Sequence, residues 1–149
     1  MTYWAWVPGL ETGLKEIDRQ HKKLVDYINL MAEAVKELDV AKTEAVLDAL
    51  INYTVVHFNF EEKMMDKAGY EFSSEHKLVH EAFKVRVLGL RKRIEEGESV
   101  NASLMNMLVK WIVDHIKKED MRYIDSVKPV LANRSWLSKT TDKLFTKKL

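Results

Sequence analysis

The chain has 149 residues, a formal net charge of +1 and no cysteine. This length suits a single domain with its own core. The missing cysteines exclude a disulfide framework, a zinc finger and an iron–sulfur cluster, and the small net charge argues against a nucleic-acid partner. Residues 1–18 lack the pattern of a secretory signal, and no apolar run approaches the roughly 18 residues that a membrane span needs. We therefore expect a cytoplasmic protein without membrane insertion.

Helical periodicity dominates the sequence. Apolar residues recur at steps of three and four over residues 18–38, 42–68, 74–96 and 101–123, which is the pattern of an amphipathic helix. The links between these ranges are short, and short links favour antiparallel neighbours. The sequence therefore predicts an all-α fold, an antiparallel up-down-up-down four-helix bundle formed by residues 18–124. An N-terminal arm (1–17) and a basic C-terminal extension (127–149) complete one domain that spans residues 1–149.

Glycine, serine and proline suggest where these helices begin and end. Gly69 and Gly97 each follow an apolar-periodic stretch, so each is expected to end a helix in the left-handed conformation. Ser73 or Ser74 is a candidate N-cap for the third helix. The chain has only two prolines, and we expect Pro129 to stop the structure that precedes it.

All the histidines of the chain lie in or beside these apolar stripes, together with two acidic residues. Pairs four apart, such as His57 with Glu61 and His76 with His80, lie on one helix face, where they can bind one ion or a pair of ions. The candidate metal ligands are His21, His57, Glu61, His76, His80, His115 and Asp120.

The spacing of His115 and Asp120 is different. Asp120 comes five positions after His115, which is roughly 140° around an ideal helix. The two residues are therefore not expected to form a simple pair on one face. Asp120 continues the edge formed by Leu108, Ile112 and Ile116 instead. These two ligands would then flank a site that is wider than one ion, which favours two metals.

Counting ligands also favours two metals. Five imidazoles and two carboxylates exceed the needs of one ion, and this ligand set suits iron, manganese or zinc. If Glu61 and Asp120 each bridge two ions and a hydroxide bridges them too, one ion has six ligands and the other five, which leaves a position open for a small diatomic ligand. A single His-x-x-x-His pair is weak evidence for a metal site. Burying seven unpaired ionisable groups, however, would cost several kcal/mol each, so we expect a metal centre to neutralise them.

The ordered ligand set resembles the hemerythrin family, specifically its single-domain bacterial members. The pattern is a histidine on the first helix, His-x-x-x-Glu on the second, His-x-x-x-His on the third and His-x-x-x-x-Asp on the fourth, and this chain fills every position. Trp4 and Trp6, with Gly13 ahead of Ile17 and Asp18, also match such proteins.

The resemblance implies a non-haem di-iron centre with a hydroxo or oxo bridge, and dioxygen as its reversible ligand. It assigns His76, His80 and His115 to the saturated iron, His21 and His57 to the iron with the open position, and Glu61 and Asp120 to the bridges. It also assigns Trp111 and Ile112 to the wall of the oxygen pocket, for which ordinary core packing is the alternative, and Tyr123 to a structural hydrogen bond.

The function that the resemblance implies is transport, storage or buffering of dioxygen, without catalysis. Two alternatives stay open at this point: an oxygen or redox sensor that acts through a separate partner, and di-iron detoxification of nitric oxide or peroxide. The nitrogen-rich ligand set favours binding over activation, because di-iron oxidases of the ferritin class use carboxylate-rich sites.

The C-terminal extension combines charge with large apolar residues. It carries a net charge of +5, and its apolar residues recur at steps loosely compatible with a short amphipathic helix: Trp136, Leu137, Leu144, Phe145 and Leu149. The favoured expectation is that this segment folds back onto the bundle. The alternative is that it binds an acidic protein, such as a recipient of oxygen, or a second copy of the chain.

Overall fold

A computed structural model describes residues 4–145, and helices form nearly all of this part of the chain. The described residues contain no strand. In chain order the elements are η1 (Pro8–Leu10), α1 (Lys15–Lys36), α2 (Val40–Ala68), α3 (Ser73–Glu95), α4 (Ala102–His115), the π-helical segment η2 (Ile116–Asp120), α5 (Met121–Ala132) and α6 (Arg134–Phe145).

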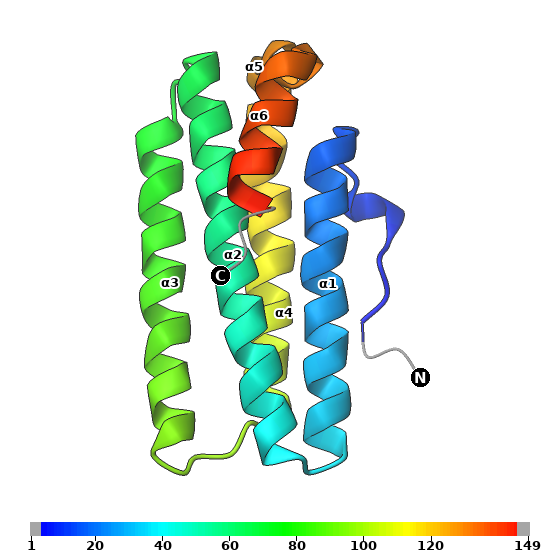
Figure 1. Ribbon diagram of the computed structural model, residues 1–149, viewed down its shortest axis with the longest axis vertical. Coiled ribbons are helices and arrows are strands. Elements are labelled where there is room, and N and C mark those ends of the chain that lie inside the picture. The colour runs from blue at the N-terminus through cyan, green and yellow to red at the C-terminus, as the bar shows by residue number, and fades with distance from the viewer. Residues whose placement is uncertain (1–3, 146–149) are drawn as a thin grey trace.

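The four long helices run alternately up and down, with the N-terminal arm beside α1 and the last two helices at one end (Figure 1). Helix α2 packs against both α1 and α3. The predicted all-α, antiparallel four-helix bundle is confirmed. No helix within residues 4–145 is both long and apolar enough to span a bilayer.

Local sequence explains most of the helix ends. The Asp39 carboxylate accepts a hydrogen bond from the Lys42 amide at the start of α2, and the Asn101 side chain accepts one from the Leu104 amide at the start of α4, both at 3.0 Å. Gly69 and Gly97 have φ values of +66° and +101°, so both predicted left-handed helix ends are confirmed.

The predicted serine cap of α3 is wrong. The residue before the helix is Phe72, which forms no side-chain cap, and Ser73 is already helical. The Ser73 hydroxyl instead donates to the Asp66 carboxylate at 2.8 Å. That carboxylate also accepts from Lys77 at 2.6 Å, so these side chains join the end of α2 to the start of α3.

Helix α1 begins at Lys15, before the expected residue 18, so the end of the predicted arm is helical. The buried carboxylate of Asp18 organises this entry. It accepts hydrogen bonds from the Thr12 amide and hydroxyl, both at 2.8 Å, and from the Gly13 amide at 3.1 Å. Gly13 has φ +85°, a conformation that favours glycine. Asp18 therefore fixes the arm against the first turn of α1.

The fourth helix continues well past residue 123, through η2 and α5 to Ala132, and Pro129 lies inside α5. The expectation that Pro129 stops the helix is therefore wrong. Proline removes the hydrogen bond to the carbonyl four residues earlier, here that of Asp125. The Asp125 side chain is 99% exposed, so water can reach this region of the backbone. Val127 and Val130 are buried on the opposite side and keep the helix on the bundle.

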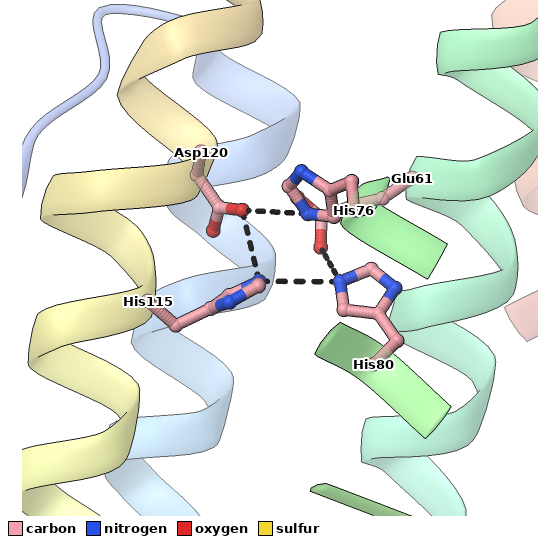
Figure 2. Close-up of side chains that lie close together, drawn as sticks. All are labelled: Glu61, His76, His80, His115 and Asp120. Carbon is pink, nitrogen blue, oxygen red and sulfur yellow. Dashed lines mark hydrogen bonds and ion pairs between the residues drawn. The ribbon is translucent and has the colours of Figure 1, made fainter. Parts of the chain in front are cut away.

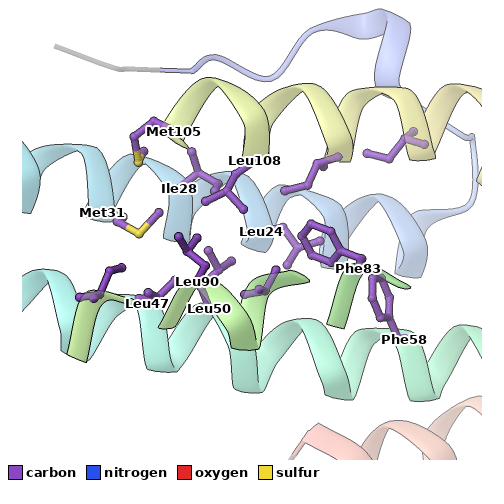
Figure 3. Packing of buried hydrophobic residues seen from close by; sticks show 14 of the residues in the cluster. Leu24, Ile28, Met31, Leu47, Leu50, Phe58, Phe83, Leu90, Met105 and Leu108 are labelled. Atoms are coloured by element: carbon purple, nitrogen blue, oxygen red, sulfur yellow. The ribbon is translucent and has the colours of Figure 1, made fainter. Parts of the chain in front are cut away.

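The main core includes Leu24, Ile28 and Met31 of α1, which pack with Leu47 and Leu50 of α2 (Figure 3). Burial of each such side chain contributes roughly 1.5–3 kcal/mol. A second apolar cluster, which includes Phe60, Met64 and Tyr123, lies at the other end. The polar cluster of histidines and carboxylates is thus enclosed between two apolar regions.

Helix α6 folds back and packs on α2 and α5, as the favoured expectation for the C-terminal extension stated. Trp136, Leu137, Leu144 and Phe145 pack against the second apolar cluster. The Trp136 and Phe145 rings lie 5.7 and 6.0 Å from the ring of Phe60. Leu149, the last residue of the predicted apolar pattern, lies outside the described residues.

We expect Trp136→Ala to lower the free energy of unfolding by about 2 kcal/mol, because it removes a half-buried indole from its contact with Phe60. The exposed Ser138 lies on the same helix, so Ser138→Ala is the matched control and should change stability by less than about 0.5 kcal/mol. Urea unfolding of both variants measures the difference. Equal stability of the two would contradict packing of α6 on α2.

Candidate metal centre

The seven predicted ligands come together at one level of the bundle, and every one is buried. Each long helix of the bundle contributes: α1 carries His21, α2 carries His57 and Glu61, α3 carries His76 and His80, and α4 with η2 carries His115 and Asp120. Figure 2 shows five of these side chains converging from three helices. The ligand atoms form two overlapping groups. One contains Glu61, His76, His80, His115 and Asp120, and the other contains His21, His57 and Glu61.

The two oxygens of Asp120 face different histidines. Oδ1 lies 3.2 Å from His76 Nε2 and 3.1 Å from His115 Nε2, whereas Oδ2 lies 3.0 Å from His21 Nε2. A carboxylate that presents one oxygen to each of two histidine groups can bridge two ions.

Glu61 also joins the two groups. Its Oε1 lies 3.1 Å from His57 Nε2 on its own helix and 3.5 Å from His80 Nε2 on α3. Glu61 and Asp120 therefore lie between a set of three histidines and a set of two.

The π-helical segment explains how His115 and Asp120 share one site. In η2 the hydrogen bonds run from residue i to i+5, so residues five apart lie above one another. The expectation that these two residues cannot form a one-face pair assumed α-helical geometry and is wrong. Single π-helical turns inside α-helices are rare and often lie at functional sites.

Deleting the exposed Lys118 should convert η2 into a regular α-helical turn, because a four-residue spacing in an α-helix keeps Asp120 above His115. We expect the shortened protein to bind as much iron as the parent chain and its metal-free form to melt no lower. Iron analysis and thermal unfolding test this. Loss of iron on deletion would show that the site needs the wider turn itself.

Burial and neighbouring charges determine the ionisation of the two carboxyls. For Glu61, burial and the charge of Asp120 both act to raise the pKa, but His57 and His80 outweigh them and the pKa is lowered. For Asp120, burial again acts to raise the pKa, but His115, His21 and His76 lower it well below the usual value. Both side chains are therefore carboxylates, the form that binds a metal.

The histidines respond in different directions. Burial lowers the pKa of His57 and outweighs the charge of Glu61. Burial acts in the same direction on His21 and His80, but the facing carboxylates outweigh it and raise the pKa of both. The charge of His21 adds to the lowering of the His57 pKa.

Three further side chains hold the candidate ligands in place. His57 Nδ1 lies 2.7 Å from Gln20 Oε1, and His80 Nδ1 lies 2.9 Å from Glu62 Oε2. Both acceptors require a proton on Nδ1, so Nε2 is free to bind a metal. Tyr123 donates a hydrogen bond to Glu61 Oε2. Burial and the charge of Glu61 raise the pKa of Tyr123 well above its usual value, so this phenol stays protonated.

Tyr123 was expected to form a structural hydrogen bond, but nothing in the sequence indicated Gln20 or Glu62. Each is the sequence neighbour of a candidate ligand and supports a histidine of another helix. Such pairs depend on how the helices pack, and one sequence does not show this.

Stacked aromatic rings fix the imidazole planes. Phe58 lies parallel to His80 at 3.7 Å between ring centroids, and Trp111 lies parallel to His115 at 4.5 Å. Phe83 in turn stacks on Trp111, with 3.8 Å between ring centroids. The rings leave little freedom for either histidine to rotate, which preorganises the centre.

The donor atoms fit a bound metal. Several of the innermost atoms are buried without a hydrogen bond: His21 Nε2, His76 Nε2, Glu61 Oε1, and both carboxylate oxygens of Asp120. Buried polar atoms normally have a partner. Here they converge instead on a common space, and nitrogen and carboxylate donors of this kind suit iron.

A small cavity of about 10 Å³ adjoins this centre, which is about the room that one water-sized molecule needs. His21 and His57 border it, and neither His76 nor His80 does. Most of its wall is apolar or aromatic. The wall is formed by His21, Leu24, Thr54, His57, Phe58, Phe83, Trp111, Ile112, His115, Ile116 and Asp120.

Trp111 and Ile112, the residues expected to line a pocket, both lie in this wall. Leu24, Phe58 and Ile116 were not singled out, although each lies next to a candidate ligand or one turn from it. Their positions in the sequence gave no sign that they border a cavity rather than fill the core.

Comparison with known proteins agrees with this geometry. The family model described as the hemerythrin HHE cation binding domain matches residues 12–126. The bacteriohemerythrin of Pseudomonas paraeruginosa is 37% identical to this chain, over 97% of the chain and 99% of its own length. That of Clostridium acetobutylicum is 30% identical, over 82% and 99%. A crystal structure of wild-type hemerythrin superposes with a TM-score of 0.80 at 30% identity, covering 84% of this chain and 98% of the other. The chain belongs to the hemerythrin family.

Proposed function

We propose that this protein binds dioxygen reversibly at a non-haem di-iron centre and acts as a carrier, store or buffer of oxygen rather than as an enzyme. His76, His80 and His115 would hold one iron, and His21 and His57 the other. Glu61 and Asp120 would bridge the two. The division of the Asp120 oxygens between the two histidine groups supports this assignment.

One observation carries the proposal: both histidines of the two-histidine set line the small cavity, whereas only one of the other three, His115, does. His21 and His57 line it, together with apolar side chains such as Leu24 and Ile112. The ion with fewer protein nitrogens would have the open position, and the small cavity lies next to it. Two ferrous ions at this centre would supply the electrons that reversible dioxygen binding requires.

The protein's own part is to keep this space dry and the ligands fixed. The one hydroxyl in the cavity wall, that of Thr54, donates to the Leu50 carbonyl at 2.7 Å and is thereby engaged. Gln20 and Glu62 orient two imidazoles, and Tyr123 orients Glu61. A dry, apolar wall disfavours loss of a reduced product to water, which supports binding over turnover.

We expect the anaerobic ferrous protein to be nearly colourless and to bind about two irons per chain. Exposure to air should produce a visible charge-transfer band, and removal of oxygen should abolish it over repeated cycles. A band that decays within the first cycle would point to sensing or detoxification instead. A protein that binds zinc and shows no change in air would rule the proposal out.

A further inference from the structure

A second, larger cavity lies on the outside of the bundle and has no part in the metal centre. Its volume is about 680 Å³, within the range of pockets for small organic molecules. It is a cleft lined by residues of α1, α2 and the end of α6, the helix that packs on α2 (Figure 1).

Aromatic side chains form the interior of the cleft. The Tyr53 ring lies 5.5 Å from Tyr27 on α1 and 5.7 Å from Phe145 on α6, so one residue from each element meets here. Val56 and Leu144 add aliphatic surface. All of these side chains are half-buried, so the cleft offers a continuous apolar surface to a ligand.

The mouth of the cleft is cationic. Arg19, Lys23 and Lys143 line it and are exposed, and no acidic residue is among the lining residues. Arg19 lies over the Phe145 ring at 5.8 Å, and Lys23 lies over the Tyr27 ring at 5.3 Å. The positive groups therefore surround the aromatic interior and would meet the charged end of an anion.

Tyr53, which lines the cleft, carries a polar atom without a partner. The hydroxyl oxygen of Tyr53 is buried and forms no hydrogen bond. A buried hydroxyl without a partner is costly, and a ligand oxygen that reaches it when the surrounding side chains shift would satisfy it. Burial raises the pKa of Tyr53, so the hydroxyl remains a donor at neutral pH.

We propose that this cleft binds a small organic carboxylate with an apolar body, such as a medium-chain fatty acid. The carboxylate would meet the cations at the mouth and accept a hydrogen bond from Tyr53, while the apolar body would pack on Tyr27, Phe145 and the aliphatic surface. Arg19 is paired with Glu16, but Lys23 and Lys143 have no acid among the lining residues, which favours this occupant over a neutral or cationic one.

The test is calorimetric titration of the full-length, iron-loaded protein with octanoate, and with 1-octanol as the neutral ligand of matched length. We expect octanoate to bind with a dissociation constant below about 1 mM and 1-octanol to bind much more weakly. Lys143→Glu should weaken octanoate binding by about tenfold, and Tyr53→Phe by about fivefold.

Lys92→Glu is the matched control, because Lys92 is exposed on α3 and does not line the cleft. It should leave octanoate binding unchanged. Arg19 is not a suitable test position, because it is linked to the metal centre. It pairs with Glu16. The Glu16 carboxylate also accepts a hydrogen bond from Gln20, and Gln20 supports His57.

Three results would overturn the proposal: no octanoate binding to the full chain, equal binding of octanoate and 1-octanol, or equal weakening by Lys92→Glu and Lys143→Glu. The Leu149→Asp variant tests whether the chain's own C-terminal segment occupies the cleft, because a charged residue would disfavour its burial there. Octanoate binding to this variant alone, and not to the parent protein, would also overturn the proposal.

Discussion

Replacing Asp120 with alanine should remove both irons, because this carboxylate contacts both histidine groups. Oδ1 faces His76 and His115, and Oδ2 faces His21. Its loss removes a carboxylate oxygen from each ion and leaves Glu61 as the one carboxylate bridge, so we expect iron content to fall from about two per chain to well below one. The visible band in air should disappear with it. Iron analysis and absorption spectroscopy of the purified variant measure the two effects.

Glu119→Ala is the matched control for this prediction. Glu119 precedes Asp120 in the same π-helical segment and belongs to neither group of candidate ligands. Its loss should leave iron content and the visible band unchanged. If Asp120→Ala keeps two irons and Glu119→Ala loses them, the assignment on the fourth helix is wrong.

Removing the iron should destabilise the whole bundle. Without metal, several buried atoms of this centre have no hydrogen-bond partner, among them Glu61 Oε1 and both carboxylate oxygens of Asp120. A bound metal would satisfy them and so stabilise the folded state. A ligand present at 1,000 times its dissociation constant stabilises the folded state by about 4 kcal/mol. For a chain of this size that corresponds to roughly 10 °C in melting temperature, which is the fall that we expect on chelation.

Thermal unfolding before and after chelation, and again after ferrous iron is restored anaerobically, measures this contribution. The Asp120→Ala variant is the control, because it should already lack iron and should show no further fall. Equal melting temperatures of the loaded and metal-free parent protein would contradict a metal centre that holds four helices together.

The sequence predicted the helices well because each has a continuous apolar stripe. Residues such as Leu24, Ile28 and Met31 recur at helical spacing and do form the core. The same periodicity placed the candidate ligands on inward faces, and the structure brings all seven together. Gly69 and Gly97 were informative because few residues other than glycine adopt the left-handed conformation that ends a helix.

Features that depend on contacts between helices could not be predicted in this way. The π-helical turn at Asp120 has no sequence signature, and it reverses the geometric argument made from an ideal α-helix. Pro129 lies inside a helix that Val127 and Val130 hold on the bundle, and this packing only the structure reveals. The support that Gln20 gives to His57 joins residues 37 positions apart on different helices.

The most direct test of the di-iron centre is anomalous diffraction from crystals of the iron-loaded protein, measured on both sides of the iron absorption edge. We expect two iron peaks about 3.5–4 Å apart. One should lie among His76, His80 and His115, the other beside His21 and His57, with Glu61 and Asp120 between them. A single peak, or iron peaks outside this group of seven side chains, would contradict the account.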